Sequence, residues 1–162
     1  MSSTTEQALH RTMAATFEEL GLVVPDLEPS AEQSAVRMDF AASVSFRGPI
    51  SGRLVLRASR TVLSELAENM LGSDNMRDEL MHQDALGEVA NVICGNFLPQ
   101  VAGANAIFVL SAPQWQDEIA SNSDNSSVKA SAALGVGQGR AVTELVLFGD
   151  LSSTAEFNAI AA

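Results

Sequence analysis

The sequence predicts an α+β domain with a mostly antiparallel sheet, two long helices and an N-terminal helix. Two pairs of segments alternate apolar and polar residues, and a short glycine-containing turn joins each pair, which is typical of β-hairpins. Three other segments carry apolar residues at the helical spacing of three and four. Hairpins pair their strands antiparallel, so a doubly wound parallel fold is not expected.

The first half of the chain switches between helical and strand periodicity. Residues 5–20 form an amphipathic pattern followed by Gly21, which predicts a helix that stops there. Residues 37–46 alternate apolar and polar side chains, and residues 53–57 return as their hairpin partner after a glycine-proline turn. A second helix is predicted over residues 61–71.

The second half is organised around a long apolar helix, predicted over residues 80–101 after a charged loop. A fully apolar run at residues 106–111 predicts a short strand, and the polar, serine-rich stretch 114–127 predicts a loop. The last hairpin is predicted from residues 128–136 and 141–148.

Composition limits the class of protein. The chain has 162 residues, 46% hydrophobic and 18% charged, which predicts one globular domain over residues 1–150 and a tail at 151–162. The net charge of -11 argues against nucleic acid and anionic membrane as partners. One cysteine, no apolar span and no basic-apolar leader favour a cytoplasmic location.

The central helix carries a polar stripe opposite its apolar face. Asp84, Glu88, Asn91 and Gly95 follow one another at offsets of four, three and four, so they share one side of the helix. Such a stripe can simply be a solvated helix face. However, asparagine is a poor helix former, and Gly87 and Gly95 each cost about 1 kcal/mol relative to alanine. We therefore interpret this side of the helix as the functional surface of the protein.

The two histidines, the cysteine and the tryptophan are better explained as structural residues than as catalytic or metal-binding residues. His10 and His82 are far apart in the sequence, and with one cysteine no metal site is expected. Cys94 lies in the apolar helix without a basic neighbour, which predicts a buried inert thiol. Trp115 is interpreted as a loop anchor or dimer contact.

The run DALGEVANVICGN, followed by IFVLSAP, resembles the CheC/CheX/FliY group of chemotaxis phosphatases. The preceding FRGPISGRLVLRAS resembles the glycine-bracketed hairpin of that group, and the match covers about residues 36–148. One ExxN motif on the later helix resembles CheX, whose relatives are typically homodimers.

The resemblance implies hydrolysis of the aspartyl phosphate on a CheY-like response regulator. It implies that Asn91 orients the attacking water and that Glu88 binds the active-site lysine of the regulator. Asp84, Gly87 and Gly95 are the expected partner-binding residues, and the chain is expected to need no cofactor of its own, because Mg²⁺ would sit on the regulator. Two alternatives remain: a non-catalytic module that sequesters a regulator or docks on a motor or signalling complex, and a purely structural dimerisation domain.

Overall fold

The computed structural model describes residues 4–72, 79–117 and 128–148. The predicted charged loop at 73–78, most of the predicted loop 114–127 and the predicted tail 151–162 lie outside these residues. The domain boundary expected at residue 150 lies outside them too, and it stays a prediction.

Ten elements follow one another along the described chain. The helices are α1 (Thr4–Glu19), α2 (Ala31–Ser34), α3 (Arg60–Leu71) and α4 (Glu79–Ala102). The strands are β1 (Phe40–Arg47), β2 (Ser51–Ala58), β3 (Val109–Leu110), β4 (Gln114–Asp117), β5 (Val128–Val136) and β6 (Gly139–Phe148).

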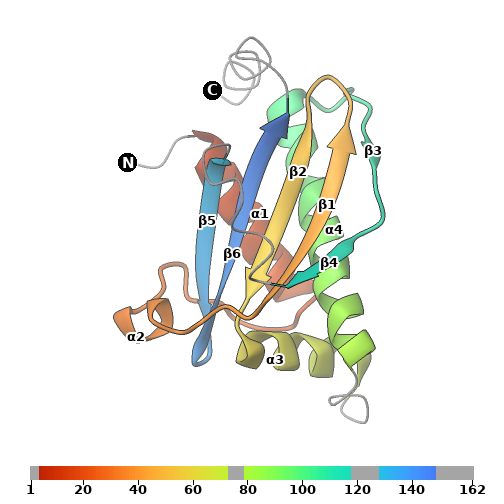
Figure 1. Cartoon of the computed structure of the whole chain (residues 1–162). Coiled ribbons are helices and arrows are strands. Elements are labelled where there is room, and N and C mark those ends of the chain that lie inside the picture. Colours follow the sequence, from red (N-terminus) through yellow and green to blue (C-terminus); the bar gives the residue numbers. More distant parts are fainter. Residues whose placement is uncertain (1–3, 73–78, 118–127, 149–162) are drawn as a thin grey trace.

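All strand pairs in the described sheet are antiparallel, as the two predicted hairpins require. The strand order is β3-β1-β2-β6-β5, and β4 pairs with the same edge of β1 as β3 does. Helices α1 and α4 pack side by side behind the sheet, α1 against β5 and α4 against β1 and β2. Helix α3 runs across the lower end of the sheet (Figure 1). The predicted α+β class is confirmed.

The core lies between the helices and the inner face of the sheet. Val44, Leu54 and Leu145 occupy one cross-strand row on this face, and none of the three exposes any surface. Leu86 and Phe97 of α4 are equally buried against them in the same hydrophobic cluster. Complete burial of a large apolar side chain stabilises the fold by about 1.5–3 kcal/mol, so this row and helix face hold α4 in a fixed orientation.

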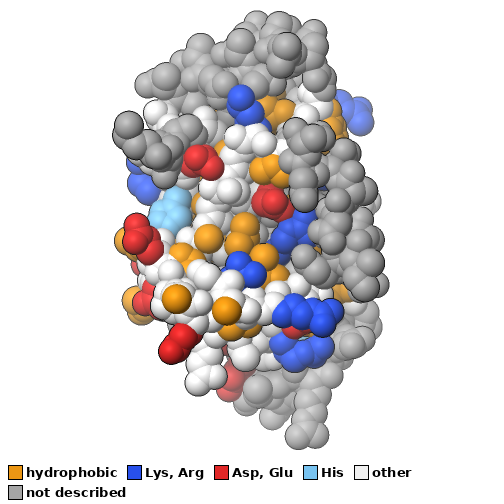
Figure 2. Space-filling model, turned by 60° about the vertical axis from the view of Figure 1, so that its left-hand side comes forward, with side chains coloured by type: hydrophobic (Ala, Val, Ile, Leu, Met, Phe, Trp, Pro, Cys, Tyr) orange, Lys and Arg blue, Asp and Glu red, His pale blue; other side chains and the backbone are white. Residues whose placement is uncertain are grey.

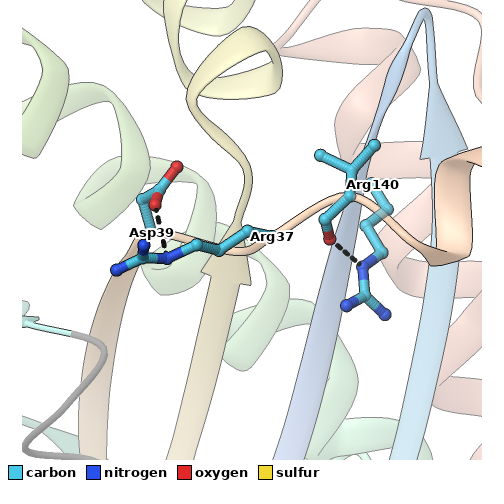
Figure 3. Close-up of polar contacts among 4 residues, drawn as sticks. Arg37, Asp39 and Arg140 are labelled. Atoms are coloured by element: carbon cyan, nitrogen blue, oxygen red, sulfur yellow. Dashed lines mark hydrogen bonds and ion pairs between the residues drawn. The ribbon is translucent and has the colours of Figure 1, made fainter.

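The first strand begins later than predicted because the residues before it are held by side-chain contacts. Figure 3 shows the ion pair between Arg37 Nε and Asp39 Oδ1 at 3.1 Å, and the Arg140 Nε–H donating to the Val36 carbonyl at 2.9 Å. The Arg140 hydrogen bond attaches the connector to the start of β6, whereas the ion pair joins two residues within the connector. Regular pairing with β2 starts only at Phe40.

The edge of the sheet differs from the prediction in two places. Only Val109–Leu110 of the apolar run 106–111 forms a strand, and Ile107 and Val109 are 82% and 70% exposed. The prediction of a polar loop from residue 114 is wrong for its first four residues, which form β4. Backbone hydrogen bonds to the free edge of β1 form whatever the side chains are, so polarity did not reveal this strand.

Candidate functional site

The polar stripe of α4 faces away from the core, as its periodicity predicts. Asp84 and Glu88 are exposed, Asn91 is half-buried and Gly95 is exposed. The opposite side of the helix is anchored by residues that are 0% exposed, which are Leu86, Val89, Ala90, Ile93 and Phe97. Packing within the domain therefore does not bury the stripe.

The polar groups of Glu88 and Asn91 make no hydrogen bond or ion pair with any part of the chain that the structure describes. Other polar residues around the helices are engaged: Asn69 Nδ2 donates to the Gly21 carbonyl at 2.8 Å, and Gln100 Nε2 donates to Thr12 Oγ1 at 2.7 Å. A half-buried carboxamide without a partner in the middle of a helix contributes nothing to helix stability. Both groups of the motif are thus free to meet an external partner.

Two grooves flank the exposed edge of α4, and Asp84 and Glu88 line both of them. The first, about 460 Å³, lies between α4 and the ends of α1 and α3. The second, about 410 Å³, lies between α4 and β4. Glu88 therefore stands on a ridge with a recess on either side, a shape that suits a protein surface better than a small enclosed ligand.

The two glycines of the predicted partner surface have different surroundings. A Cβ on Gly87 would lie 2.9 Å from Cβ of Pro113, so Gly87 lets the chain after β3 approach α4 closely. A Cβ on Gly95 would meet no atom within 4 Å, and its side of the helix is open. Contact of either glycine with a partner stays a prediction.

No Lys, Arg or His occurs among the described residues that line the two grooves. Arg53 and Arg57 of β2 alternate with core residues Leu54 and Leu56, so they point to the sheet face opposite the helices. Arg57 Nε pairs there with Glu144 Oε1 at 2.6 Å. On the side of the molecule that carries β5 and α2, Lys and Arg side chains gather at the lower right of the described surface (Figure 2). The surroundings of Glu88 are acidic by contrast.

The remaining reactive residues lie apart from the stripe. Burial raises the pKa of the Cys94 thiol to about 12, which keeps it protonated and unreactive, and it is 1% exposed. His10 Nε2 lies 2.7 Å from the Leu27 carbonyl of the connector that follows α1. Within residues 4–72, 79–117 and 128–148, no three His, Cys, Asp or Glu side chains come together as a metal site. None of the helices in these ranges combines the length and apolarity that a membrane crossing requires.

Sequence reasoning missed the residues that other elements bring to Glu88. Leu22 comes from the connector after α1, Met70 comes from the end of α3, and Trp115 comes from β4. Trp115 packs on Phe40 with ring centroids 5.2 Å apart, so it anchors a strand where a loop was predicted, and it also lines the second groove. A dimer contact at Trp115 stays a prediction. No local pattern pairs these residues with α4, because their proximity depends on how α1, α3 and β4 pack around that helix.

Comparison with known proteins identifies relatives of this arrangement. Residues 40–129 match the family model described as chemotaxis phosphatase CheX. No curated protein sequence matches the chain significantly.

Solved structures share the fold at low sequence identity. The chemotaxis protein CheX from Desulfovibrio desulfuricans is 18% identical, with a TM-score of 0.64 over 89% of this chain and 99% of that one. CheX from Vibrio vulnificus is 16% identical, with a TM-score of 0.66 over 89% and 96% of the two chains. The CheX-CheY-BeF3-Mg²⁺ complex from Borrelia burgdorferi has a chain that is 18% identical, with a TM-score of 0.59 over 88% and 97%.

Proposed function

The chain belongs to the family of the chemotaxis phosphatase CheX, and from this premise we propose that it removes the phosphoryl group from the aspartyl phosphate of a CheY-like response regulator. The observation that carries the proposal is the pair Glu88 and Asn91. Both side chains stand on the outer side of α4, and neither is engaged by any described residue. The related complex contains CheY with BeF3 and Mg²⁺, which supports a receiver domain as the partner.

The proposed reaction is an in-line attack of water on phosphorus. The water oxygen forms the new P–O bond, and the bond from phosphorus to the aspartate oxygen breaks. The aspartate leaves as a carboxylate, and both water protons end on the released inorganic phosphate. Such a transfer depends on positioning and charge stabilisation more than on covalent chemistry by the protein. Asn91 suits this role because its carboxamide both accepts and donates hydrogen bonds and does not titrate.

Glu88 would fix the geometry of docking. A carboxylate on an exposed ridge can form a charge-assisted contact with a lysine of the regulator, one helical turn before Asn91. The Mg²⁺ of the reaction would be held by the regulator, since the described carboxylates near Asn91 form no ligand cluster of their own. The homodimer is proposed from the resemblance to CheX, and the cytoplasmic location is proposed from composition together with that resemblance.

The experiment compares the decay of a phosphorylated regulator with wild type and Asn91→Ala at catalytic concentration. We expect Asn91→Ala to lower the rate of dephosphorylation by a factor of roughly 100 or more, because an orienting group in the transition state is lost. Binding to the regulator in its BeF3-Mg²⁺ form is expected to change less than threefold, which isothermal titration calorimetry measures.

Asn96→Ala is the matched control, because Asn96 is an exposed asparagine on the same helix, about 140° round from Asn91. Glu88→Ala is paired with Glu68→Ala, an exposed glutamate of α3 that lines neither groove. We expect Glu88→Ala to weaken binding and Glu68→Ala to leave it unchanged. Full activity of Asn91→Ala would contradict the catalytic role, and stoichiometric binding without turnover by wild type would favour the non-catalytic binding module.

A further inference from the structure

The end of α1 has an unusual residue in a left-handed conformation. The Val23 N–H donates to the Phe17 carbonyl at 3.3 Å, which joins the segment after α1 to the last turn of the helix. The residue just before Val23 is Leu22, with φ 54°, and it is the one non-glycine residue of the described chain with a positive φ. The sequence predicted a stop at Gly21, but the position that needs glycine-like freedom is the next one.

Gly21 is fixed by packing instead. A Cβ there would lie 2.5 Å from Cδ2 of Leu66 and 2.8 Å from the Phe17 carbonyl oxygen. Gly21 therefore allows the segment after α1 to lie close to Leu66 of α3, and the left-handed turn falls on a leucine. A left-handed conformation is unfavourable for leucine because Cβ approaches the following carbonyl oxygen, and the residues that usually adopt it are glycine and asparagine.

Burial does not compensate the strain at Leu22. The side chain is 67% exposed and lies outside the hydrophobic cluster of the core. The turn itself is well held, because Asn69 of α3 donates to the Gly21 carbonyl at 2.8 Å. Strained residues that persist without a packing benefit concentrate at binding and active sites.

Leu22 lines the first groove beside the ExxN motif. The apolar part of this groove is Leu20, Leu22, Met70 and Ala85, and its carboxylates are Glu19, Asp84 and Glu88. Glu88 belongs to both the groove and the proposed docking ridge, so a regulator that meets Glu88 also covers the groove. Three carboxylates without a described cation favour an occupant that carries a positive charge.

We propose that this groove is the specificity site for the regulator, and that it receives an apolar side chain of the receiver domain that is flanked by a lysine or arginine. The proposal rests on the phosphatase function proposed above and names the contact that selects its partner. Leu22 is presented at a conformational cost to stabilise this contact. A second copy of this chain suits the groove poorly, because the net charge of the chain is -11.

The test uses Leu22→Gly and Leu22→Met in the full chain, with the CheY-like receiver domain that wild type dephosphorylates, charged with acetyl phosphate. Leu22→Gly removes the side chain and relieves the strain together. We expect its KM to rise roughly tenfold with kcat unchanged, while Tm rises by about 2–4 °C. Leu22→Met keeps an apolar side chain, and its KM should stay within threefold of wild type.

Val24→Ala is the matched control for lost apolar surface, because Val24 is 89% exposed and lines neither flanking groove. Glu19→Gln and Glu18→Gln are adjacent exposed residues, of which only Glu19 lines the groove, so only Glu19→Gln should raise KM. An unchanged KM for Leu22→Gly, or a Tm that falls, would overturn the proposal.

The two proposals fail in different ways. If wild type hydrolyses no phosphorylated receiver domain but binds one in its BeF3-Mg²⁺ form, the phosphatase function fails, and the Kd of Leu22→Gly for that domain decides the groove. If wild type hydrolyses the phosphate and Leu22→Gly matches it in KM, the groove proposal alone fails. If wild type binds no receiver domain, both proposals are overturned.

Discussion

Single polar residues on α3 and α4 differ in whether the fold uses their side chains. Glu88 and Asn91 contact nothing in the described fold that requires their chemistry, whereas Asn69 and Gln100 each fill a hydrogen-bonding role. The two glycines differ in the same respect: the fold uses Gly87, which faces Pro113, whereas Gly95 faces open space. A residue without a structural role on an exposed helix is a candidate for partner contact.

Substituting the two glycines should give opposite effects on stability. Gly95→Ala is expected to raise the free energy of unfolding by about 1 kcal/mol, since alanine favours helix and no atom obstructs its Cβ. Gly87→Ala is expected to lower it by about 1 kcal/mol, because displacing Pro113 outweighs the gain in helix propensity. Urea denaturation of both variants measures the difference.

One outcome would contradict the difference expected between Gly87 and Gly95. Stabilisation by Gly87→Ala equal to that by Gly95→Ala would show that Pro113 moves without cost. If Gly95→Ala stabilises the fold and also weakens regulator binding, the expected role of Gly95 in close approach to the partner is supported.

At the scale of elements, short segments position the longer ones. Helix α2 has only four residues, yet Ser30 and Gln33 form a complete capping box. The Gln33 side chain, 6% exposed, also donates to Asp26 Oδ2 at 2.8 Å and to the Gly137 carbonyl at 2.9 Å. One side chain therefore joins the connector after α1 to the hairpin of β5 and β6.

Gln33→Ala should remove the hydrogen bonds that join the connector to the hairpin. The variant loses three side-chain hydrogen bonds at a buried position, so we expect the free energy of unfolding to fall by roughly 2–3 kcal/mol. Ser34→Ala, at an exposed neighbouring position, serves as the control and should change it by less than about 0.5 kcal/mol. Equal stability of the two variants in chemical denaturation would refute the role of Gln33.

At the scale of the whole molecule, charge is unevenly distributed. The grooves beside Glu88 are lined by carboxylates without a described cation, while Arg53, Arg57 and Arg140 alternate with core residues and point to the opposite face of the sheet. With a net charge of -11, the field of the molecule attracts a basic partner surface towards the helical side. The same field repels acidic partners.

Association with the regulator should therefore depend on salt. Raising the ionic strength from 0.05 to 0.5 M shortens the screening length, so the association rate constant is expected to fall about tenfold or more. The dissociation rate constant should change much less, and stopped-flow fluorescence measures both. An association rate constant that does not change with salt would show that steering by the acidic surface plays no part.

The motif on α4 was predictable because it is local: an offset of three places Glu88 and Asn91 on one side of any helix. The hairpins were predictable for the same reason, since alternation and turn residues lie within a few positions of one another. The resemblance to CheX added the substrate class, which periodicity does not contain. The exposure of the stripe followed from the apolar residues on the other side of the helix.

The sequence by itself determined the α+β class, the antiparallel hairpins and the shared helix side of Glu88 and Asn91. Tertiary structure alone decided that β4 completes the edge of the sheet, that Gly87 serves the contact with Pro113, and that Leu22 carries the left-handed turn. The physical reason is the separation along the chain between the residues that interact. Helical and strand periodicity act over a few residues, whereas the grooves beside Glu88 form only where α1, α3, α4 and β4 meet across large separations in the chain.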